Sequence, residues 1–328
     1  MKLIVYEHIT SGALCDEALP PSLAAEGEMM LSALVEDLLE LTDIPITILR
    51  DARLPVTDWM RRAENITVLS SATMSQFQQH WQACLQEIPY FLLVAPETDN
   101  ILLSLQQQVT DAGKTYIGCT LESTHLCSDK LRCYQQLRQA DVPTPTTYSA
   151  TSWLLNNQLT DLPWVVKPQD GAGCLQTMKF DSLESTRNYL SSFTTSNLNN
   201  LIVQPYISGT PLSLSLYLHE DSLQLLSINE QVITQQQQQL VFQSCVINSV
   251  KAQQVTAQQA IQLAQQVCNA IAGLSGYIGI DFMLTSDGPV VIEINPRLTT
   301  AYVGLSQSRI TNPALPLWQH LQILNRNK

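Results

Sequence analysis

The sequence predicts an α/β lobe followed by a larger α+β region that is built on antiparallel strands. Over residues 1–120, short apolar strands alternate with helical patterns, which is typical of a parallel sheet covered by helices. Beyond residue 200, strand-like runs follow one another with few helices between them, which favours antiparallel pairing. Near the C-terminal end, two apolar runs that carry polar side chains flank the turn-like segment Ser286-Asp287-Gly288-Pro289.

Composition limits the classes of protein and partner. The chain has 328 residues, of which 45% are hydrophobic and 14% charged, enough for two or three lobes with substantial cores. A net charge of −12 argues against general nucleic-acid binding, so a polyanionic ligand would need a local cluster of cations, helix ends and metal. No apolar run reaches the roughly 18 residues of a membrane span, and residues 1–6 turn polar too soon for a signal peptide. We therefore expect a cytoplasmic protein with no membrane or nucleic-acid partner, and we interpret its eight cysteines as scattered reduced thiols.

The first lobe alternates strands and helices. Strands are predicted at residues 3–6, 46–49, 66–69 and 90–94, and helices at residues 23–41 and 75–85. Because ligands of such sheets bind beyond the carboxyl ends of the strands, residues 7–12 and 95–99 are the loops expected to hold a small substrate. Glu7, His8 and Glu97 in these loops are the candidates for a general base, with ordinary loop or helix-capping roles as the alternative for His8 and Glu97.

Two lysines and a small-residue loop mark the middle of the chain. Asp129 is expected to cap a helix that begins at Lys130. A strand that ends in Lys167 leads into a loop containing Gly171 and Gly173, whose backbone N–H groups could approach phosphate oxygens. A plain turn is the alternative for this loop, and a helix-surface lysine is the alternative for Lys130.

Antiparallel strands make up most of the last region. We predict a strand with its connection at residues 201–209, strands at residues 212–218, 222–228 and 240–247, and helices at residues 255–271, 298–304 and 316–324. Leucine alternates with serine or tyrosine over residues 212–218, which predicts a half-buried strand. The five-glutamine run at residues 235–239 is interpreted as a mobile hairpin tip, and a part in a lid stays open.

The C-terminal hairpin carries Asp281, Glu293 and Asn295 in otherwise apolar strands, where an unpaired carboxylate would be costly to bury. A three-residue loop at residues 286–288 would place Asp281 opposite Glu293 and Asn295 opposite Gly279, whereas a two-residue turn would send Asp281 to the other face. Hard oxygen ligands with open positions suit Mg²⁺ or Mn²⁺. An edge hairpin with solvated acids is the alternative.

The order of these features resembles the ATP-grasp superfamily over nearly the whole chain. Asp281 followed by Glu293-Ile294-Asn295-Pro296-Arg297 is the specific motif, and the other segments gain weight from their order. More narrowly, four segments resemble the tyramine–L-glutamate ligases of methanofuran-type and methylofuran-type cofactor biosynthesis. These segments are Tyr6-Glu7, Ala95-Pro96-Glu97-Thr98, Ser128-Asp129-Lys130 and the run from Glu293 to Leu305.

The resemblance implies an ATP-grasp fold in which an N-terminal lobe, residues 1–120, precedes two antiparallel-sheet lobes, residues 121–204 and 205–328, that hold ATP between them. It implies ATP-dependent joining of a carboxylate to an amine through an acyl phosphate, with ADP and phosphate as products. The implied small-molecule substrates are L-glutamate, through its γ-carboxylate, and tyramine or a similar arylamine. Another ATP-grasp amino-acid or peptide ligase and a non-catalytic nucleotide-binding regulator are the alternatives, and a homo-oligomer stays open.

The resemblance also assigns roles to residues. ATP is implied to contact Lys130, Lys167, Gly171, Gly173 and the backbone of Gln204, Tyr206 and Ile207, and Mg²⁺ or Mn²⁺ is implied to bind Asp281, Glu293 and Asn295. Arg297 would stabilise charge on the acyl phosphate, with a salt bridge as the alternative. Two departures from the family pattern concern the nucleotide. Pro205, which has no N–H, stands where many relatives carry Glu, and Gly209-Thr210-Pro211 lacks the acidic residue that often binds ribose.

Overall fold

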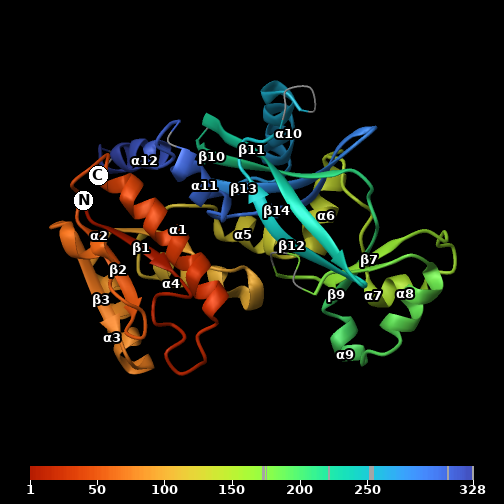
Figure 1. Ribbon diagram of the computed structural model, residues 1–328, viewed down its shortest axis with the longest axis horizontal. Helices are drawn as coiled ribbons and strands as arrows, with labels where there is room; N and C mark the ends of the chain where they lie inside the picture. The colour runs from red at the N-terminus through yellow and green to blue at the C-terminus, as the bar shows by residue number, and fades with distance from the viewer. Residues whose placement is uncertain (172–173, 175, 221, 251–254, 309, 327–328) are drawn as a thin grey trace.

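The computed structural model describes residues 1–171, 174, 176–220, 222–250, 255–308 and 310–326. Its first lobe is built on a five-stranded parallel sheet of order β3-β2-β1-β4-β5 (Figure 1). The strands are β1 (Leu3–Glu7), β2 (Ile46–Asp51), β3 (Ile66–Ser71), β4 (Tyr90–Val94) and β5 (Thr115–Tyr116). The helices are α1 (Pro21–Leu39), α2 (Asp58–Arg62), α3 (Met74–Glu87), the 3-10 helix η1 (Thr98–Asn100) and α4 (Ile101–Asp111). All four predicted strands and both predicted helices are confirmed.

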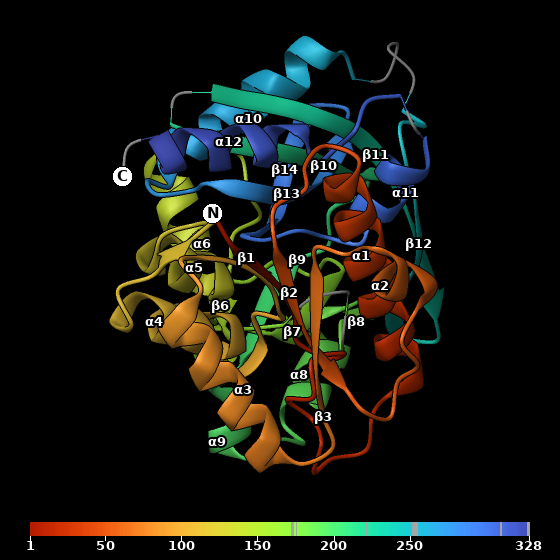
Figure 2. The ribbon, with the colours of Figure 1, turned by 90° about the vertical axis from the view of Figure 1, so that its left-hand side faces the viewer.

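The parallel sheet is covered on both faces. Alternate residues of β1 belong to two separate cores, with Leu3 and Val5 packed against α1 and Ile4 and Tyr6 against α3 and α4. The C-terminal helix α12 (Leu315–Arg326) joins the first of these cores and lies against the same lobe in Figure 2. The continuous apolar runs of β1 and β4 are therefore explained by burial on both sides.

A nine-stranded antiparallel sheet forms the rest of the molecule. Its order is β14-β13-β10-β11-β12-β8-β7-β9-β6. The strands are β6 (Tyr148–Ser149), β7 (Trp164–Pro168), β8 (Met178–Phe180), β9 (Leu201–Pro205), β10 (Thr210–His219), β11 (Ser222–Gln236), β12 (Gln239–Val246), β13 (Gly276–Thr285) and β14 (Gly288–Asn295). The helices are α5 (Leu121–Ser128), α6 (Lys130–Gln139), α7 (Ala150–Leu155), α8 (Leu183–Leu190), α9 (Thr195–Leu198), α10 (Ala257–Ala270) and α11 (Ala301–Ser308). The predicted fold class, a parallel-sheet lobe followed by antiparallel sheet, is confirmed.

The strand β10 differs from its prediction. It was expected to be half-buried, but it lies between β13 and β11 in the middle of the sheet, and every residue from Leu212 to Leu218 is buried. Its leucines share a core with α5, α6 and α10. The opposite face carries Ser213, Ser215 and Tyr217, and Tyr217 belongs to the core of the first lobe. The prediction was wrong because the hydroxyls of Ser213 and Ser215 are buried against the neighbouring strand β11, where they accept hydrogen bonds from Asn229 Nδ2 at 3.3 and 3.2 Å.

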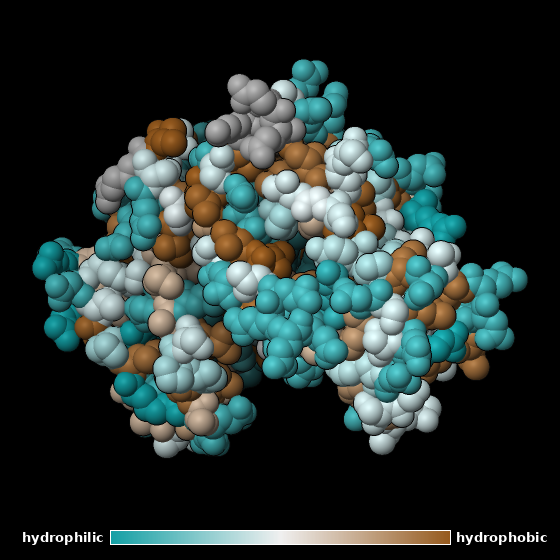
Figure 3. All heavy atoms as spheres, turned by 45° about the vertical axis from the view of Figure 1, so that its right-hand side comes forward, coloured by the Kyte–Doolittle hydropathy of each residue, from teal (hydrophilic) through white to brown (hydrophobic). Residues whose placement is uncertain are grey.

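The glutamine run forms the predicted hairpin tip. Gln237 and Gln238 make the turn between β11 and β12, and all five glutamines are exposed. The tip also joins the two halves of the sheet, because Gln239 pairs with Met178 of β8 and the Lys179 N–H donates to the Gln238 carbonyl at 2.6 Å. In Figure 3, where the β7–β9 end comes forward, hydrophilic side chains cover the middle of the molecule. Mobility of the tip stays a prediction.

No helix in the described ranges is long and apolar enough to cross a membrane.

Candidate active site

The β13–β14 hairpin brings the three predicted metal ligands together. Asp281 lies opposite Glu293, and Asn295 lies opposite Gly279 on the same face. The predicted pairing is therefore confirmed. Asn295 Nδ2 donates a hydrogen bond to Asp281 Oδ2 at 3.1 Å. A Cβ at Gly279 would lie 2.8 Å from Cγ2 of Thr299, so only glycine fits here without displacing the segment after β14.

The loop of this hairpin differs from its prediction. The sequence predicts a three-residue loop, but Thr285 pairs with Gly288, so the turn holds only Ser286 and Asp287. A β-bulge restores the register: one extra residue of β14, Ile292, is inserted where the pairing shifts. Gly288 has a positive φ of 120°, as expected for glycine at the end of a tight turn. Without the bulge, a two-residue turn would put the two carboxylates on opposite faces.

Asp281 is held by two amides. Besides the bond from Asn295, its Oδ1 accepts a hydrogen bond from Gln231 Nε2 of β11 at 2.8 Å. Burial raises the pKa of Asp281 to about 7, and the neighbouring Glu293 carboxylate adds to this rise. Two adjacent carboxylates in a partly dry site favour a bound cation, which would relieve their repulsion. Gln231 was not predicted, because β11 reaches Asp281 only through the folded order of the sheet.

Lys130 connects the metal hairpin with the small-residue loop. Its Nζ lies 3.2 Å from Glu293 Oε1 and donates to the carbonyl of Gly171. Asp129 caps α6 as predicted, since its side chain accepts from the backbone N–H groups of residues 131 and 132. Gln169 adds a further tie, because its carbonyl accepts from the Lys130 N–H at 2.9 Å and its side chain donates to Asp129. These bonds fix the start of α6, from which the Lys130 side chain reaches Glu293 and Gly171.

Lys167 lies at the end of β7 and is buried. Burial lowers its pKa to about 8; Glu293 opposes this shift, whereas Lys130 reinforces it. The two lysines therefore approach the same carboxylate from separate elements. A polyanion with a divalent cation would complement both the lysines and the acids.

The segment after β9 was assigned to adenine recognition. Gln204 is buried, and its side-chain amide donates to Thr147 Oγ1 at 2.8 Å. The Tyr206 N–H donates to the Pro163 carbonyl at 2.9 Å, so that group is already used inside the sheet. Ile207 follows directly, and its backbone stays the predicted contact. A small recess nearby is lined by Cys127, Lys130, Cys133, Tyr134, Leu137, Thr144, Gln204, Ile292, Glu293 and Ile294.

The small-residue loop contacts the first lobe. Gly171 has a φ of 105°, a conformation that favours glycine, and a Cβ there would lie 3.8 Å from Oγ1 of Thr98. The Asp99 N–H donates to Asp170 Oδ2 at 3.1 Å. Gly173, also assigned to ATP, lies outside the described residues.

Arg297 forms the ion pair that was the alternative to its catalytic role. Its Nη2 donates to Glu97 Oε2 at 2.8 Å, and Nη1 donates to the Leu298 carbonyl at 3.2 Å. Burial lowers the pKa of Arg297, but the charge of Glu97 and its hydrogen bond outweigh burial, so the pKa ends above its usual value. The pair does not exclude catalysis, because a guanidinium has further N–H donors for an anionic substrate.

The other two candidate bases have structural partners. The Glu7 carboxylate accepts three hydrogen bonds, from the Ile9 N–H and from the N–H and hydroxyl of Thr10, and thereby shapes the loop after β1. His8 Nδ1 lies 3.0 Å from the Tyr6 hydroxyl, and burial lowers the pKa of His8 to about 4. Glu97 differs from both, since it reaches out of the first lobe to Arg297, which follows β14.

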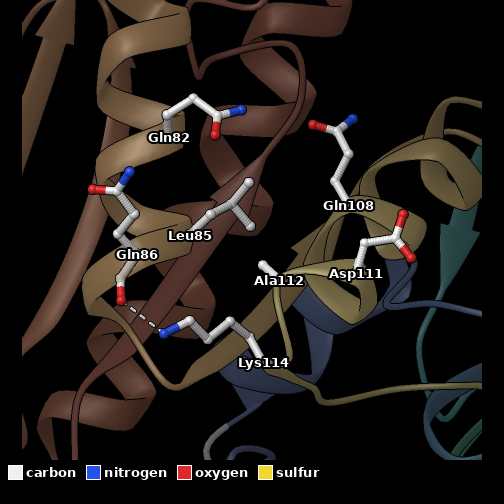
Figure 4. Close-up of a pocket in the computed structure, with 7 residues that line it drawn as sticks. All are labelled: Gln82, Leu85, Gln86, Gln108, Asp111, Ala112 and Lys114. Carbon is white, nitrogen blue, oxygen red and sulfur yellow. Dashed lines mark hydrogen bonds between the residues drawn. The ribbon is translucent and has the colours of Figure 1, made fainter.

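A separate surface pocket lies between α3 and α4 (Figure 4). Its lining residues are Gln82, Leu85, Gln86, Gln108, Asp111, Ala112 and Lys114. All belong to the C-terminal parts of these helices or just follow them, and Lys114 Nζ donates to the Gln86 carbonyl at 2.8 Å. In a parallel α/β sheet, helices end at the edge opposite the carboxyl ends of the strands, where ligands bind. This pocket is therefore not the active site.

The donor chemistry fits a magnesium or manganese ion with nucleotide phosphates. Among the described residues no group of three or more His, Cys, Asp or Glu side chains could hold a metal. Two carboxylates with an amide are nevertheless what such ions use when phosphate oxygens and water complete the coordination. Lys130 and Lys167 would supply the cations that phosphate needs.

Comparisons with known proteins agree with this architecture. The profile of an ATP-grasp domain matches residues 127–301, more than half of the chain, and that of a pre ATP-grasp 3 domain matches residues 44–124. The chain therefore belongs to the ATP-grasp family and is an ATP-dependent ligase that forms C–N bonds.

Two curated relatives are named tyramine–L-glutamate ligase. The protein of Methanocaldococcus jannaschii is 26% identical over 296 residues, which cover 90% of this chain and 81% of that protein. The protein of Methanocaldococcus fervens is 25% identical over 315 residues, which cover 95% and 91%. Among solved structures, an ATP-grasp superfamily protein of Archaeoglobus fulgidus has a TM-score of 0.69 at 24% identity, covering 97% of this chain and 88% of that one. The D-alanine–D-alanine ligase of Bacillus anthracis has a TM-score of 0.64 at 15% identity and full coverage of both chains, which is a likeness of fold alone.

Proposed function

We propose that this ligase joins the γ-carboxylate of L-glutamate to tyramine or a similar arylamine, in the biosynthesis of a methanofuran-type one-carbon carrier. The two tyramine–L-glutamate ligases that align with 90% and 95% of the chain support the choice of substrates. The observation that carries the proposal is the pairing of Asp281 with Glu293 beside two lysines. This arrangement suits activation of a carboxylate by ATP through an acyl phosphate.

Each group has a proposed part in this reaction. Asp281, Glu293 and Asn295 would hold Mg²⁺ or Mn²⁺, which when bound supplies Lewis-acid neutralisation of phosphate charge. Lys130 and Lys167 bind phosphate oxygens as point charges. The loop that contains Gly171 covers the phosphates with backbone N–H groups. The charge that develops during transfer is thereby met by groups already fixed in place, which is the main requirement of phosphoryl transfer.

The remaining contacts concern adenine and the acyl group. The Gln204, Tyr206 and Ile207 backbone is proposed to meet the adenine edge, with the Ile207 N–H as the donor, because the Tyr206 N–H is already bonded to the Pro163 carbonyl. Arg297 is proposed to stabilise charge on the acyl phosphate, because its guanidinium retains N–H donors besides those used by Glu97 and Leu298.

ADP formation tests this function. The purified protein is incubated with Mg-ATP and L-glutamate, with and without tyramine, and products are identified by mass. We expect ADP only when both substrates are present, together with the mass of a glutamyl-amine. ADP with glutamate and another amine would keep the ligase and discard tyramine. Metal-dependent nucleotide binding without ADP, across a panel of acids and amines, would instead support a regulatory protein.

A further inference from the structure

Glu97 and Arg297 connect the first lobe with the metal-site strand. Glu97 follows β4 at the carboxyl edge of the parallel sheet, and Arg297 follows β14, two residues beyond Asn295. Their side chains are only 6% and 13% exposed, and the distance from Arg297 Nη2 to Glu97 Oε2 is 2.8 Å. The charge of a buried guanidinium next to the metal site is therefore balanced by a residue from another lobe.

Two contacts orient the Arg297 guanidinium. Nη2 donates to Glu97, and Nη1 donates to the Leu298 carbonyl at 3.2 Å. Because the guanidinium is planar and rigid, bonds at two of its nitrogens define the direction of the remaining N–H groups. The bond to the Leu298 carbonyl is the longer of the two and is made to the next residue in the chain. Glu97 thus supplies the contact that selects one orientation.

The turn that carries Glu97 is itself unusual. Asp99 and Asn100 both have left-handed backbone conformations, with φ of 55° and 57°, which non-glycine residues seldom adopt. This turn is held from two sides. The Asn100 N–H donates to the Glu97 carbonyl at 3.2 Å, and the Asp99 N–H donates to Asp170, next to Gly171 of the small-residue loop. The same turn therefore contacts the small-residue loop through Asp99 and contacts Arg297 through Glu97.

We propose that Glu97 is a positioning residue of the ligation reaction, which holds the Arg297 guanidinium in the orientation that meets the activated carboxylate. This inference rests on the proposed role of Arg297. It assigns Glu97 to neither proton transfer nor nucleotide binding. Loss of the Glu97 charge lowers kcat, because Arg297 can then turn away from the reacting group, while ATP binding by Lys130 and Lys167 is retained.

The test compares two conservative variants. Glu97→Gln keeps the size of the side chain and removes its charge. Asp37→Asn is the matched control, because buried Asp37 of α1 also contacts the C-terminal part of the chain, through Ser306 Oγ of α11 at 3.0 Å. ADP release is measured with Mg-ATP and whichever acid–amine pair the wild type uses, starting with L-glutamate and tyramine. We expect kcat of Glu97→Gln to fall about 100-fold with the KM for ATP within about threefold, Glu97→Asp to regain part of the loss, and Asp37→Asn to match the wild type.

Two results would overturn the proposal. One is a Glu97→Gln enzyme with a kcat within about threefold of wild type; the other is an equal loss in Asp37→Asn, which would mark a general effect of weakened lobe contacts. A second measurement needs no turnover. Urea unfolding of the wild type, Glu97→Gln, Arg297→Met and the double variant should give non-additive effects, whereas additive effects would show that Glu97 does not hold Arg297. If the wild type turns over only other substrates, the proposal of L-glutamate and tyramine is wrong. The comparison of kcat between the wild type, Glu97→Gln and Asp37→Asn then still decides the role of Glu97.

Discussion

Lys130 and Glu293 form an ion pair, with 3.2 Å between Nζ and Oε1, that ties the first residue of α6 to the metal-site strand β14. The same ammonium group donates to the Gly171 carbonyl, so one side chain contacts both the β13–β14 hairpin and the small-residue loop. The Lys130 side chain therefore joins the two sides of the proposed nucleotide site.

Replacing Lys130 should weaken nucleotide binding more than folding. A charge-assisted hydrogen bond contributes about 1.5–3 kcal/mol, so Lys130→Gln is expected to raise the Kd for Mg-ATP by about 10-fold to 100-fold, measured by calorimetry. Lys114→Gln is the control, since Lys114 also donates to a backbone carbonyl but lies at the pocket between α3 and α4. An unchanged Kd in Lys130→Gln would contradict the phosphate contact.

Loss of either metal carboxylate should abolish turnover with little loss of folding. Glu293→Ala and Asp281→Asn remove oxygen ligands, whereas the apolar core packs against the hairpin through neighbouring residues such as Ile280, Phe282 and Ile294, which these variants keep. ADP release and thermal unfolding are measured together, with Asp287→Asn at the exposed hairpin turn as the control. Near-normal activity in either variant would show the metal assignment to be wrong, and unfolding would instead indicate a structural role for the acids.

Mg-ATP should stabilise the protein against heat. A ligand at 100 times its Kd adds about 2.7 kcal/mol to the free energy of unfolding, which raises the melting temperature. Adding EDTA should remove most of this shift, because the carboxylates then repel the phosphates. A shift that is unchanged by EDTA would argue against a metal between Asp281, Glu293 and the nucleotide.

The affinity for ATP should fall at alkaline pH because of Lys167. Its pKa is lowered from 10.5 to about 8, so the ammonium form that binds phosphate is lost as the pH rises through 8. The unfolded chain then binds more protons than the folded chain between pH 8 and 10.5, so this group alone makes the free energy of unfolding increase over that range. Lys167→Arg stays charged and should give a flatter dependence of Kd on pH. Parallel curves for the two proteins would refute the assignment.

The glutamine tip offers a test of stability away from the site. Gln237 has a φ of 56°, in the left-handed region that costs a side-chain residue about 1–2 kcal/mol. Gln237→Gly should remove this cost. The greater flexibility of glycine in the unfolded chain offsets about 0.5–1 kcal/mol of the gain. The free energy of unfolding, measured in urea, should therefore rise by about 0.5–1 kcal/mol. Gln238→Gly, at a position with no positive φ, should only lower it. Equal effects of the two substitutions would contradict the described turn.

Local patterns were sufficient for most elements. The apolar run of β4 was predicted to the residue, and Asp129 was identified as the cap of α6, because strand periodicity and capping depend on neighbours in sequence. Short helices such as α2, α7 and α9 were missed. They span 4 to 6 residues, too few for a helical repeat to be visible.

The sequence by itself determined that two carboxylates and an amide sit on one hairpin, because alternation along each strand and the turn between them are local properties. It also placed Lys130 at the start of a helix and Lys167 at the end of a strand. Only the tertiary structure decided that a bulge at Ile292 corrects the register, that Gln231 reaches Asp281 across β10, and that Glu97 meets Arg297, 200 residues away. Such contacts depend on how strands are ordered and lobes are packed, and no periodicity in the chain records that order.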